Sequence, residues 1–475
     1  MPGIAGRAGV RNRPARVSLI DKYPYGKAPF ALLVIAIVSV GIRVATARRH
    51  DERPDLVIVT HTDAHYASYG RAIPRFEREH GVKVQLQLVN WASLQARLQS
   101  SILADADVPD LAELFEGSIG YFTRGPAEDF GLMDLTDRLH RDGLYDRLVQ
   151  SRFSLWSARG RVYGLPHDVH PVMLAYRRDL VEQLGIDVSQ LTTWDKFVEV
   201  GQRITRDYDG DGVIDHYMID LRDDGNWSLD TLMLQRGGQF FDPDGNVALA
   251  TEDNAQLIRW HILQSRGPHK IGYDFGWGQP VAKAMIDGLV VFVWAPDWRS
   301  WVFEDEVPSL KGKMALMPLP AWTPGGRRTS VWGGTGLIIM KATKHPDLAW
   351  ELAKYLYFDT PELGKRFQAT NIIPVLKDAW NLPEFDRPNP YWSNEPIGRM
   401  YATLAPDAPA VYSSPVDAQA RTKLDEAYTR SVEYYLAHRD EGEEGLMRAI
   451  RANLAKVAAD VRRYADRESK LRTAR

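Results

Sequence analysis

A strand–helix–strand pattern over residues 56–89 restricts the fold more than any other feature of the chain. Leu56 to Thr60 (LVIVT) is a short, β-branched apolar run that is typical of a buried strand. Helical spacing follows from Tyr69 to His80, Gly81 ends it, and residues 82–89 (VKVQLQLV) alternate with a period of two. Because a strand, a helix and a strand at this spacing form a βαβ unit, we predict a parallel sheet with helices on its faces.

The alternation of strands and helices continues along the chain. Further strands are predicted from about residue 108 and at 171–176, 289–294, 313–317 and 336–340. Helices are predicted at 91–103, 179–184, from 193, at 345–358 and across 417–467. The 475 residues exceed what one core usually holds, yet no linker rich in proline, glycine and serine divides them. We therefore expect two lobes that exchange strands, not consecutive domains.

Charge and cysteine content exclude several classes of protein. The 59 basic residues nearly balance the 62 acidic ones, so we predict no nucleic-acid partner. The absence of cysteine excludes a disulfide framework, a thiolate metal site, a cysteine nucleophile and a lipid-acylated cysteine anchor. Aromatic residues are numerous, with 14 tryptophans and 20 tyrosines, which fits either a large core or a surface on which sugars stack.

Residues 28–42 (APFALLVIAIVSVGI) form an uncharged apolar run near the N-terminus. The run is shorter than the roughly 20 residues that span a bilayer and is typical of the hydrophobic segment of an export signal. The six basic residues before it, against one acid, predict a cytoplasmic leader over residues 1–27 and an exported remainder. Ala45-Thr46-Ala47 has the form of a signal-peptidase site, so residues 28–47 are predicted as a cleaved signal peptide or a retained transmembrane anchor.

Several segments, in order, resemble extracellular solute-binding protein family 1, the binding components of carbohydrate ABC transporters. The resemblance runs from about Asp55 to Trp380 and departs at residues 281–285 (VAKAM), where the glycine of the family is missing. The segments that carry it are residues 74–84 (PRFEREHGVKV), 108–110 (VPD), 163–166 (YGLP), 176–185, 193–195 (TWD), 237–246 (GGQFFDPDGN) and 333–354 (GGTGLIIMKATKHPDLAWELAK).

This resemblance implies a two-lobed α/β fold of the periplasmic-binding-protein type (type II), with the ligand cleft between the lobes. Lobe 1 is expected to comprise residues 53–166 plus 321–372, and lobe 2 residues 167–320 plus 373–475. The implied function is non-enzymatic: a monomer in the periplasm or at the cell surface captures a small carbohydrate and delivers it to the permease subunits of an ABC importer. An anchored sensor or scaffold with the same lobes is an alternative.

Ligand contacts are expected in loops at the carboxyl ends of strands, where His61 and Asp63 follow the first predicted strand. Residues 167–170 (HDVH) fall where the first crossing between lobes is expected, and most tryptophans lie near turns or strand ends. The resemblance implies that rings near Trp277 and Trp298 form a floor on which a sugar stacks. The predicted ligand-binding residues are His61, Asp63, Glu116, His167, Asp168, His170, Trp227, Trp277, Trp294, Trp298, Trp332, Gly333 and Gly334.

The histidines also support a competing prediction, an exported metal-dependent hydrolase. Imidazoles and carboxylates bind zinc or manganese, and a metal-bound water can hydrolyse a substrate. The metal would be held by two clusters, His61/Asp63/His65 and His167/Asp168/His170. The chain contains no G-x-S-x-G, phosphate-binding loop or H-E-x-x-H motif that would indicate another mechanism.

An acidic loop predicts either a structural calcium site or a turn that caps itself. Asp207, Asp209, Asp211 and Asp215 occupy positions 1, 3, 5 and 9 of an EF-hand-like loop. Position 12, which should supply a bidentate acid, is Met218. Aspartate and glycine in a turn also hydrogen-bond locally without an ion, so both interpretations stay open, and no other cofactor is expected.

Overall fold

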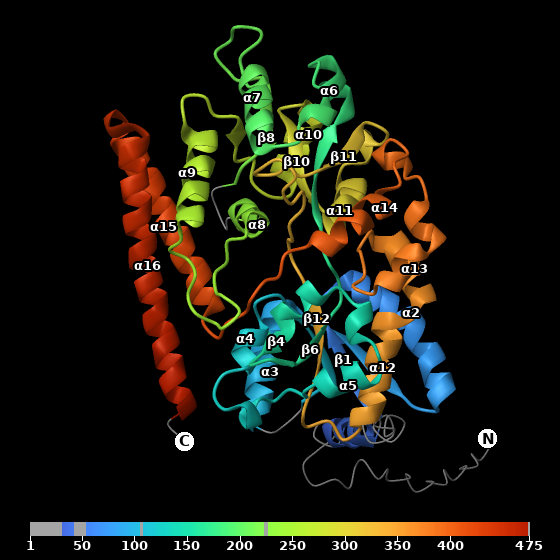
Figure 1. Cartoon of the computed structure of the whole chain (residues 1–475). Coiled ribbons are helices and arrows are strands. Elements are labelled where there is room, and N and C mark those ends of the chain that lie inside the picture. Colours follow the sequence, from blue (N-terminus) through green and yellow to red (C-terminus); the bar gives the residue numbers. More distant parts are fainter. Residues whose placement is uncertain (1–30, 42–53, 105–107, 223–226, 474–475) are drawn as a thin grey trace, which may run out of the picture. The chain divides into compact units, whose positions relative to one another are not determined.

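The computed structural model describes residues 31–41, 54–104, 108–222 and 227–473 (Figure 1). The chain divides into two units, Met1–Asp55 and Leu56–Arg475. In the first unit, residues 31–41 form an exposed helix, while the predicted leader 1–27 and the ends of the predicted membrane segment, 28–30 and 42–47, lie outside the described residues. Within the described ranges, we find no helix with both the length and the apolar character needed to cross a bilayer.

The first sheet of the second unit contains the predicted βαβ unit. Its strand order is β2 (Val84–Leu88), β1 (Leu56–Thr60), β3 (Leu111–Phe115), β12 (Thr335–Ile339), β6 (Gly164–Pro166). Strand β1 runs parallel to β2 and β3, and α2 (Asp63–His80) connects β1 to β2, so the prediction is confirmed. Helix α2 begins six residues earlier than predicted, directly after the strand, and Gly81 ends it in the left-handed conformation at φ 67°.

The second sheet is built from the middle of the chain. Its strand order is β11 (Met314–Pro318), β7 (Val172–Arg177), β10 (Val290–Pro296), β8 (Tyr217–Asp220), β9 (Gly272–Tyr273). Every residue of β10 is buried, as expected for a continuous apolar run covered on both faces. The strands divide between the two sheets as the predicted lobes require, and the lobe boundaries themselves stay a prediction.

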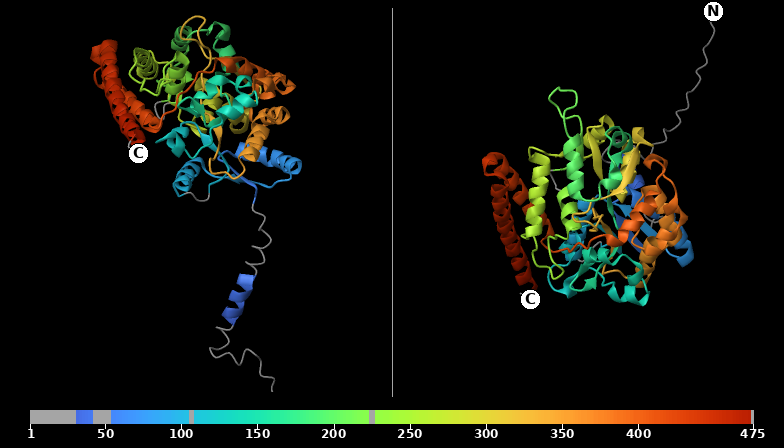
Figure 2. Two further views of the ribbon diagram at one scale, coloured as in Figure 1. Left: turned by 60° about the horizontal axis from the view of Figure 1, so that its bottom comes forward. Right: turned by 45° about the horizontal axis from the view of Figure 1, so that its top comes forward.

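Helices cover both sheets (Figure 1). Two long C-terminal helices, α15 (Asp417–Ala437) and α16 (Gly442–Thr473), lie side by side against α9 (Glu252–Arg266) (Figure 2), so the helical prediction for residues 417–467 is confirmed with a break at 438–441. The other elements are α3 (Trp91–Ala104), α4 (Ile119–Phe122), α5 (Thr136–Arg141), α6 (Arg178–Gln183), α7 (Trp194–Ile204), α8 (Trp227–Arg236), α10 (Gln279–Asp287), α11 (Asp297–Glu306), α12 (Pro346–Phe358), α13 (Thr360–Thr370), α14 (Ile397–Leu404), β4 (Ser157–Ala158) and β5 (Arg161–Val162).

Three connecting segments meet between the sheets. The first, residues 167–171, joins β6 to β7; the second, 319–334, joins β11 to β12; the third, 371–374, follows α13. Isolated bridges join Asp168 to Pro374 and Pro171 to Val331, so the first segment lies beside each of the others. This arrangement places residues far apart in the sequence around one region.

Candidate ligand-binding site

A cavity of about 650 Å³ opens beside the connecting segments. Its volume lies within the roughly 300–1,000 Å³ typical of small-molecule sites. The lining residues come from loops of both sheets and from all three segments: His61, Thr62, His65, Trp91, Phe115, Asp168, His170, Arg222, Trp277, Trp298, Trp332, Gly333, Gly334, Thr335 and Ile372. A second cavity, of about 500 Å³, contains none of the predicted site residues.

Strand ends position most of these side chains. His61 follows β1, Phe115 ends β3, Trp91 opens the helix after β2, and Arg222 lies two residues beyond β8. Trp298 occupies the first turn of α11, directly after β10. The cavity thus forms where loops leave the carboxyl ends of strands, as expected for an α/β sheet.

His61 lines the cavity, and one of its ring nitrogens has no hydrogen-bond partner among the described residues. Its Nδ1 lies 3.2 Å from the Thr62 hydroxyl, while its Nε2 is buried and has no hydrogen-bond partner within the described part of the chain. Burial lowers the pKa of His61, which favours the neutral imidazole. A neutral imidazole can accept or donate one hydrogen bond at Nε2, so the group suits a ligand hydroxyl.

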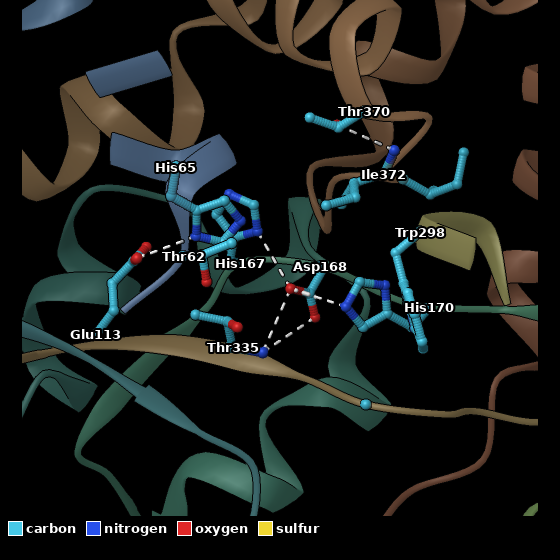
Figure 3. A network of polar contacts seen from close by, with 12 residues as sticks. Thr62, His65, Glu113, His167, Asp168, His170, Trp298, Thr335, Thr370 and Ile372 are labelled. Carbon is cyan, nitrogen blue, oxygen red and sulfur yellow. Dashed lines mark hydrogen bonds and ion pairs between the residues drawn. The ribbon is translucent and has the colours of Figure 1, made fainter. Parts of the chain in front are cut away.

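His65 is held from behind by the buried carboxylate of Glu113 (Figure 3). Its Nδ1 lies 3.0 Å from Glu113, which also accepts hydrogen bonds from the hydroxyls of Tyr357, Thr60 and Tyr69. This carboxylate is saturated by protein donors, so its role is to fix the His65 ring at the cavity wall.

His167 lies behind the cavity and contacts protein groups through both ring nitrogens. Its Nδ1 is 3.1 Å from Asp168 Oδ2, and its Nε2 accepts from the Arg366 guanidinium at 2.9 Å. Burial lowers the pKa of His167 to about 3, so the ring is neutral at physiological pH. His167 does not line the cavity, contrary to its predicted position.

The two histidine clusters predicted for the hydrolase do not converge on one metal centre. Asp63 is exposed in the first turn of α2, and both nitrogens of His170 face carboxylates, Asp297 at 2.6 Å and Asp168 at 3.1 Å. A different group, His65, Glu113 and His167, has ligand atoms within 4.8 Å of one another. In this group, Nε2 of His167 already accepts a hydrogen bond from the Arg366 cation, so the group is unsuited to a metal ion.

Three further indoles line the cavity together: Trp277 and Trp298 follow strands of the second sheet, and Trp332 lies in the second connecting segment. The ring centroids of Trp277, Trp298 and Trp332 lie 6.1–6.3 Å apart, and Trp298 Nε1 donates to the carbonyl of Trp332 at 3.0 Å. The guanidinium groups of Arg299 and Arg222 lie over the Trp277 ring, 4.6 and 5.4 Å from its centroid. These cation–π contacts help to hold the ring in place.

Other predicted site residues lie elsewhere. Trp294 is fully buried, and its Nε1 donates to the carbonyl of Asp220 at 2.8 Å, so it belongs to the core and not to the cavity wall. The half-buried Glu116 side chain is also absent from the lining, and burial raises its pKa. Trp227 opens α8, but its side chain lies outside the described residues.

The sequence-based site missed Thr62, His65, Trp91, Phe115, Arg222, Thr335 and Ile372, although His65 was named in the hydrolase alternative. Trp91, Phe115 and Arg222 lie at or just after strand ends, which is the signal that led to His61. Thr335 begins β12 directly after the second connecting segment, and Ile372 lies in the third segment; neither position carries a local pattern that indicates the cavity.

The acidic loop brings Asp207, Asp209 and Asp215 together, with carboxylate oxygens within 4.8 Å of one another. The carboxylate of Asp207 accepts from the amides of Gly210 and Gly212, and that of Asp211 from the amide of Val213. The local hydrogen bonds of a self-capped turn are therefore present, and calcium binding stays a prediction.

The family model described as "Bacterial extracellular solute-binding protein" matches residues 60–361. An arabinooligosaccharide-binding protein of Halalkalibacterium halodurans is 27% identical over 345 residues, which cover 71% of this chain and 75% of the relative. A Bacillus subtilis protein of the same name is 24% identical and covers 76% and 82%. The sugar-binding protein MalE of Xanthomonas citri, 17% identical, has the same fold with a TM-score of 0.70 over 87% of this chain and 99% of its own. The chain belongs to the bacterial extracellular solute-binding protein family.

Proposed function

We propose that this protein captures a carbohydrate, with short oligosaccharides the first candidates, in the cavity between its two sheets and delivers it to an ABC importer. The observation that carries the proposal is that one cavity is lined by the Trp277, Trp298 and Trp332 indoles and by His61, whose Nε2 has no partner among the described residues. A sugar has apolar ring faces that stack on indoles and hydroxyl edges that hydrogen-bond. The names of the arabinooligosaccharide-binding relatives support the same ligand class.

A binding role, and not hydrolysis, fits the polar groups of the cavity. Asp168, the carboxylate that lines it, lies within 3.3 Å of the Thr335 amide and within 3.1 Å of His167 and His170. It is therefore occupied by protein donors and is not free to serve as a general acid or base. The hydrolase alternative finds no support in the family match either.

The N-terminal region would keep the protein outside the cytoplasm and near its importer. In this proposal residues 28–47 act as a signal peptide or as a retained membrane anchor, and the unit from Leu56 onward works as a monomer outside the membrane. The family description as extracellular and the basic residues before the apolar run support this placement.

Calorimetry with the full-length chain in detergent tests the ligand class directly. The panel would comprise arabinose, arabinotriose, lactose, maltotriose and a linear polyol, since the polyol has hydroxyls without an apolar ring face. We expect one-to-one binding of at least one oligosaccharide and none of the polyol. Failure of every sugar to bind, or turnover of an aryl glycoside, would contradict the proposal.

A further inference from the structure

Both ring nitrogens of His170 face buried carboxylates. This arrangement fixes the position of the ring and favours its positively charged form. Nδ1 lies 2.6 Å from Asp297 Oδ1 and Nε2 lies 3.1 Å from Asp168 Oδ2. Asp168 and Asp297 are 1% and 0% exposed, and His170 is 6% exposed. An imidazolium carries a proton on both nitrogens, so two buried carboxylates at these distances favour the protonated ring.

The carboxylates on either side of His170 bind backbone amides of different connecting segments. Asp168, in the first segment, accepts from the amide of Thr335, which begins β12 directly after the second segment. Asp297, at the start of α11, accepts from the amide of Ile373 in the third segment at 2.6 Å. Removing the charge of His170 would leave two buried carboxylates without their shared cation.

The ring also shapes the cavity itself. His170 lines it, has a left-handed backbone at φ 55° and lies where a Cβ on Gly333 would meet its Cδ2 at 3.3 Å. Arg152 donates to the carbonyls of Asp168 and Gly333, which holds the backbone of the first and second segments together below the ring. A small displacement of His170 would therefore move Gly333 and Gly334, which line the cavity.

We propose that His170, as an imidazolium between Asp168 and Asp297, is the positioning residue that holds the three connecting segments in the arrangement that binds the ligand. The proposal rests on the proposed function, because its main readout is carbohydrate affinity. His170 acts here through the backbone of the segments and not through a bond to the ligand.

The neighbouring charges indicate how the effect depends on pH. Burial alone would lower the pKa of His170, but Asp168 and Asp297 raise it to about 10. Other charged or titratable groups near this arrangement are Arg152, His61, His167, Glu116 and Tyr401, and the neutral His167 adds no cation. Because the pKa in the folded protein lies above the ordinary value, the contribution of the proton to the free energy of unfolding is complete below about pH 6.5 and is lost as the pH rises through about 10. The folded protein itself keeps the proton until the pH comes close to about 10.

The test compares the pH profile of affinity in the wild-type chain and in Asp297→Asn. The substitution keeps the shape of the side chain but removes one of the two charges that hold the proton, so the His170 proton should be lost at a lower pH. We expect wild-type affinity to be constant from about pH 6 to about pH 9, and that of Asp297→Asn to fall by up to about tenfold per pH unit within this range. The control Asp378→Asn, which removes an exposed carboxylate paired with Arg147, should give the wild-type profile.

Nuclear magnetic resonance of histidine-labelled, full-length wild-type protein tests the charge state without any sugar. The His170 signals, assigned by their loss in His170→Asn, should stay those of an imidazolium at about pH 8. Titration of His170 in its ordinary range, or a flat affinity profile in Asp297→Asn, would overturn the inference. If Asp297→Asn does not fold, the wild-type titration decides alone; if no sugar binds the wild type, the proposed function fails while this titration still tests the charge.

Discussion

The two sides of the cavity hold different chemistry. On the side of the first sheet, His61 and His65 present imidazoles beside the rings of Trp91 and Phe115, and Glu113 fixes His65 from behind. On the side of the second sheet, Trp277 and Trp298 present indoles that pack with Trp332. In the proposed function, a ligand with an apolar face and a hydroxyl edge would be oriented between these two sides, and substitutions can test each side separately.

The largest expected effect is on folding and distinguishes a core tryptophan, Trp294, from the cavity tryptophans Trp277 and Trp298. Trp294 lies four residues before Trp298 but is fully buried, next to Trp194 at 6.0 Å between ring centroids. Trp294→Ala should lower the free energy of unfolding by about 3–5 kcal/mol, because it leaves a cavity in the core. Denaturant unfolding of the full-length chain measures it. A loss below about 1 kcal/mol would mean that Trp294 is not a core residue.

The next largest effect is expected from the loss of a tryptophan that lines the cavity. Trp298→Ala deletes a half-buried stacking surface and the hydrogen bond that fixes Trp332, so carbohydrate affinity should fall by about 2–4 kcal/mol, or roughly 30-fold to nearly 1,000-fold. Calorimetry with the best-binding sugar measures this loss. Trp301→Ala is the matched control, since Trp301 lies on the same helix, is 40% exposed and is absent from the cavity lining. Equal losses of affinity in Trp298→Ala and Trp301→Ala would contradict a specific role for the cavity tryptophans in binding.

The smallest effect on affinity is expected from the loss of an imidazole that lines the cavity. His61→Ala removes one hydrogen bond to a ligand hydroxyl, worth about 0.5–1.5 kcal/mol, so the dissociation constant should rise roughly twofold to tenfold. Asp63→Ala, two residues away on the exposed first turn of α2, should leave affinity unchanged. A larger loss for Asp63 than for His61 would show that the ligand lies outside the cavity described here.

Strand positions could be predicted because their signal is local. The apolar run at residues 56–60 and the alternation at 82–89 record which side of each segment is buried, and both strands form within these ranges. Trp294 shows the limit of this reasoning. It ends an apolar run predicted as a strand, yet its proximity to a turn led to a ligand-binding prediction, and the structure places it in the core.

The cavity itself depended on information that single segments do not carry. The strand-end rule was applied to β1 and led to His61; applied to β2 and β3 as well, it would have indicated Trp91 and Phe115. Arg222 follows β8, a strand that was not predicted. No such rule reaches Thr335 or Ile372. Their positions follow from the pairing of the connecting segments, which joins residues more than a hundred positions apart.

The exposure of two indoles, one from each side of the cavity, gives the protein a built-in optical reporter. Trp91 is 53% exposed and Trp277 is 46% exposed, whereas Trp156, Trp194, Trp294, Trp350 and Trp392 are fully buried. Indole emission shifts to shorter wavelength when water leaves the ring. A ligand that covers Trp91 and Trp277 would therefore change the fluorescence of the protein, while the emission of the fully buried tryptophans stays constant. Since the chain has no cysteine, a single cysteine introduced at position 91 would also accept one dye at one place. Ligand capture could then be followed in real time without labelling the sugar.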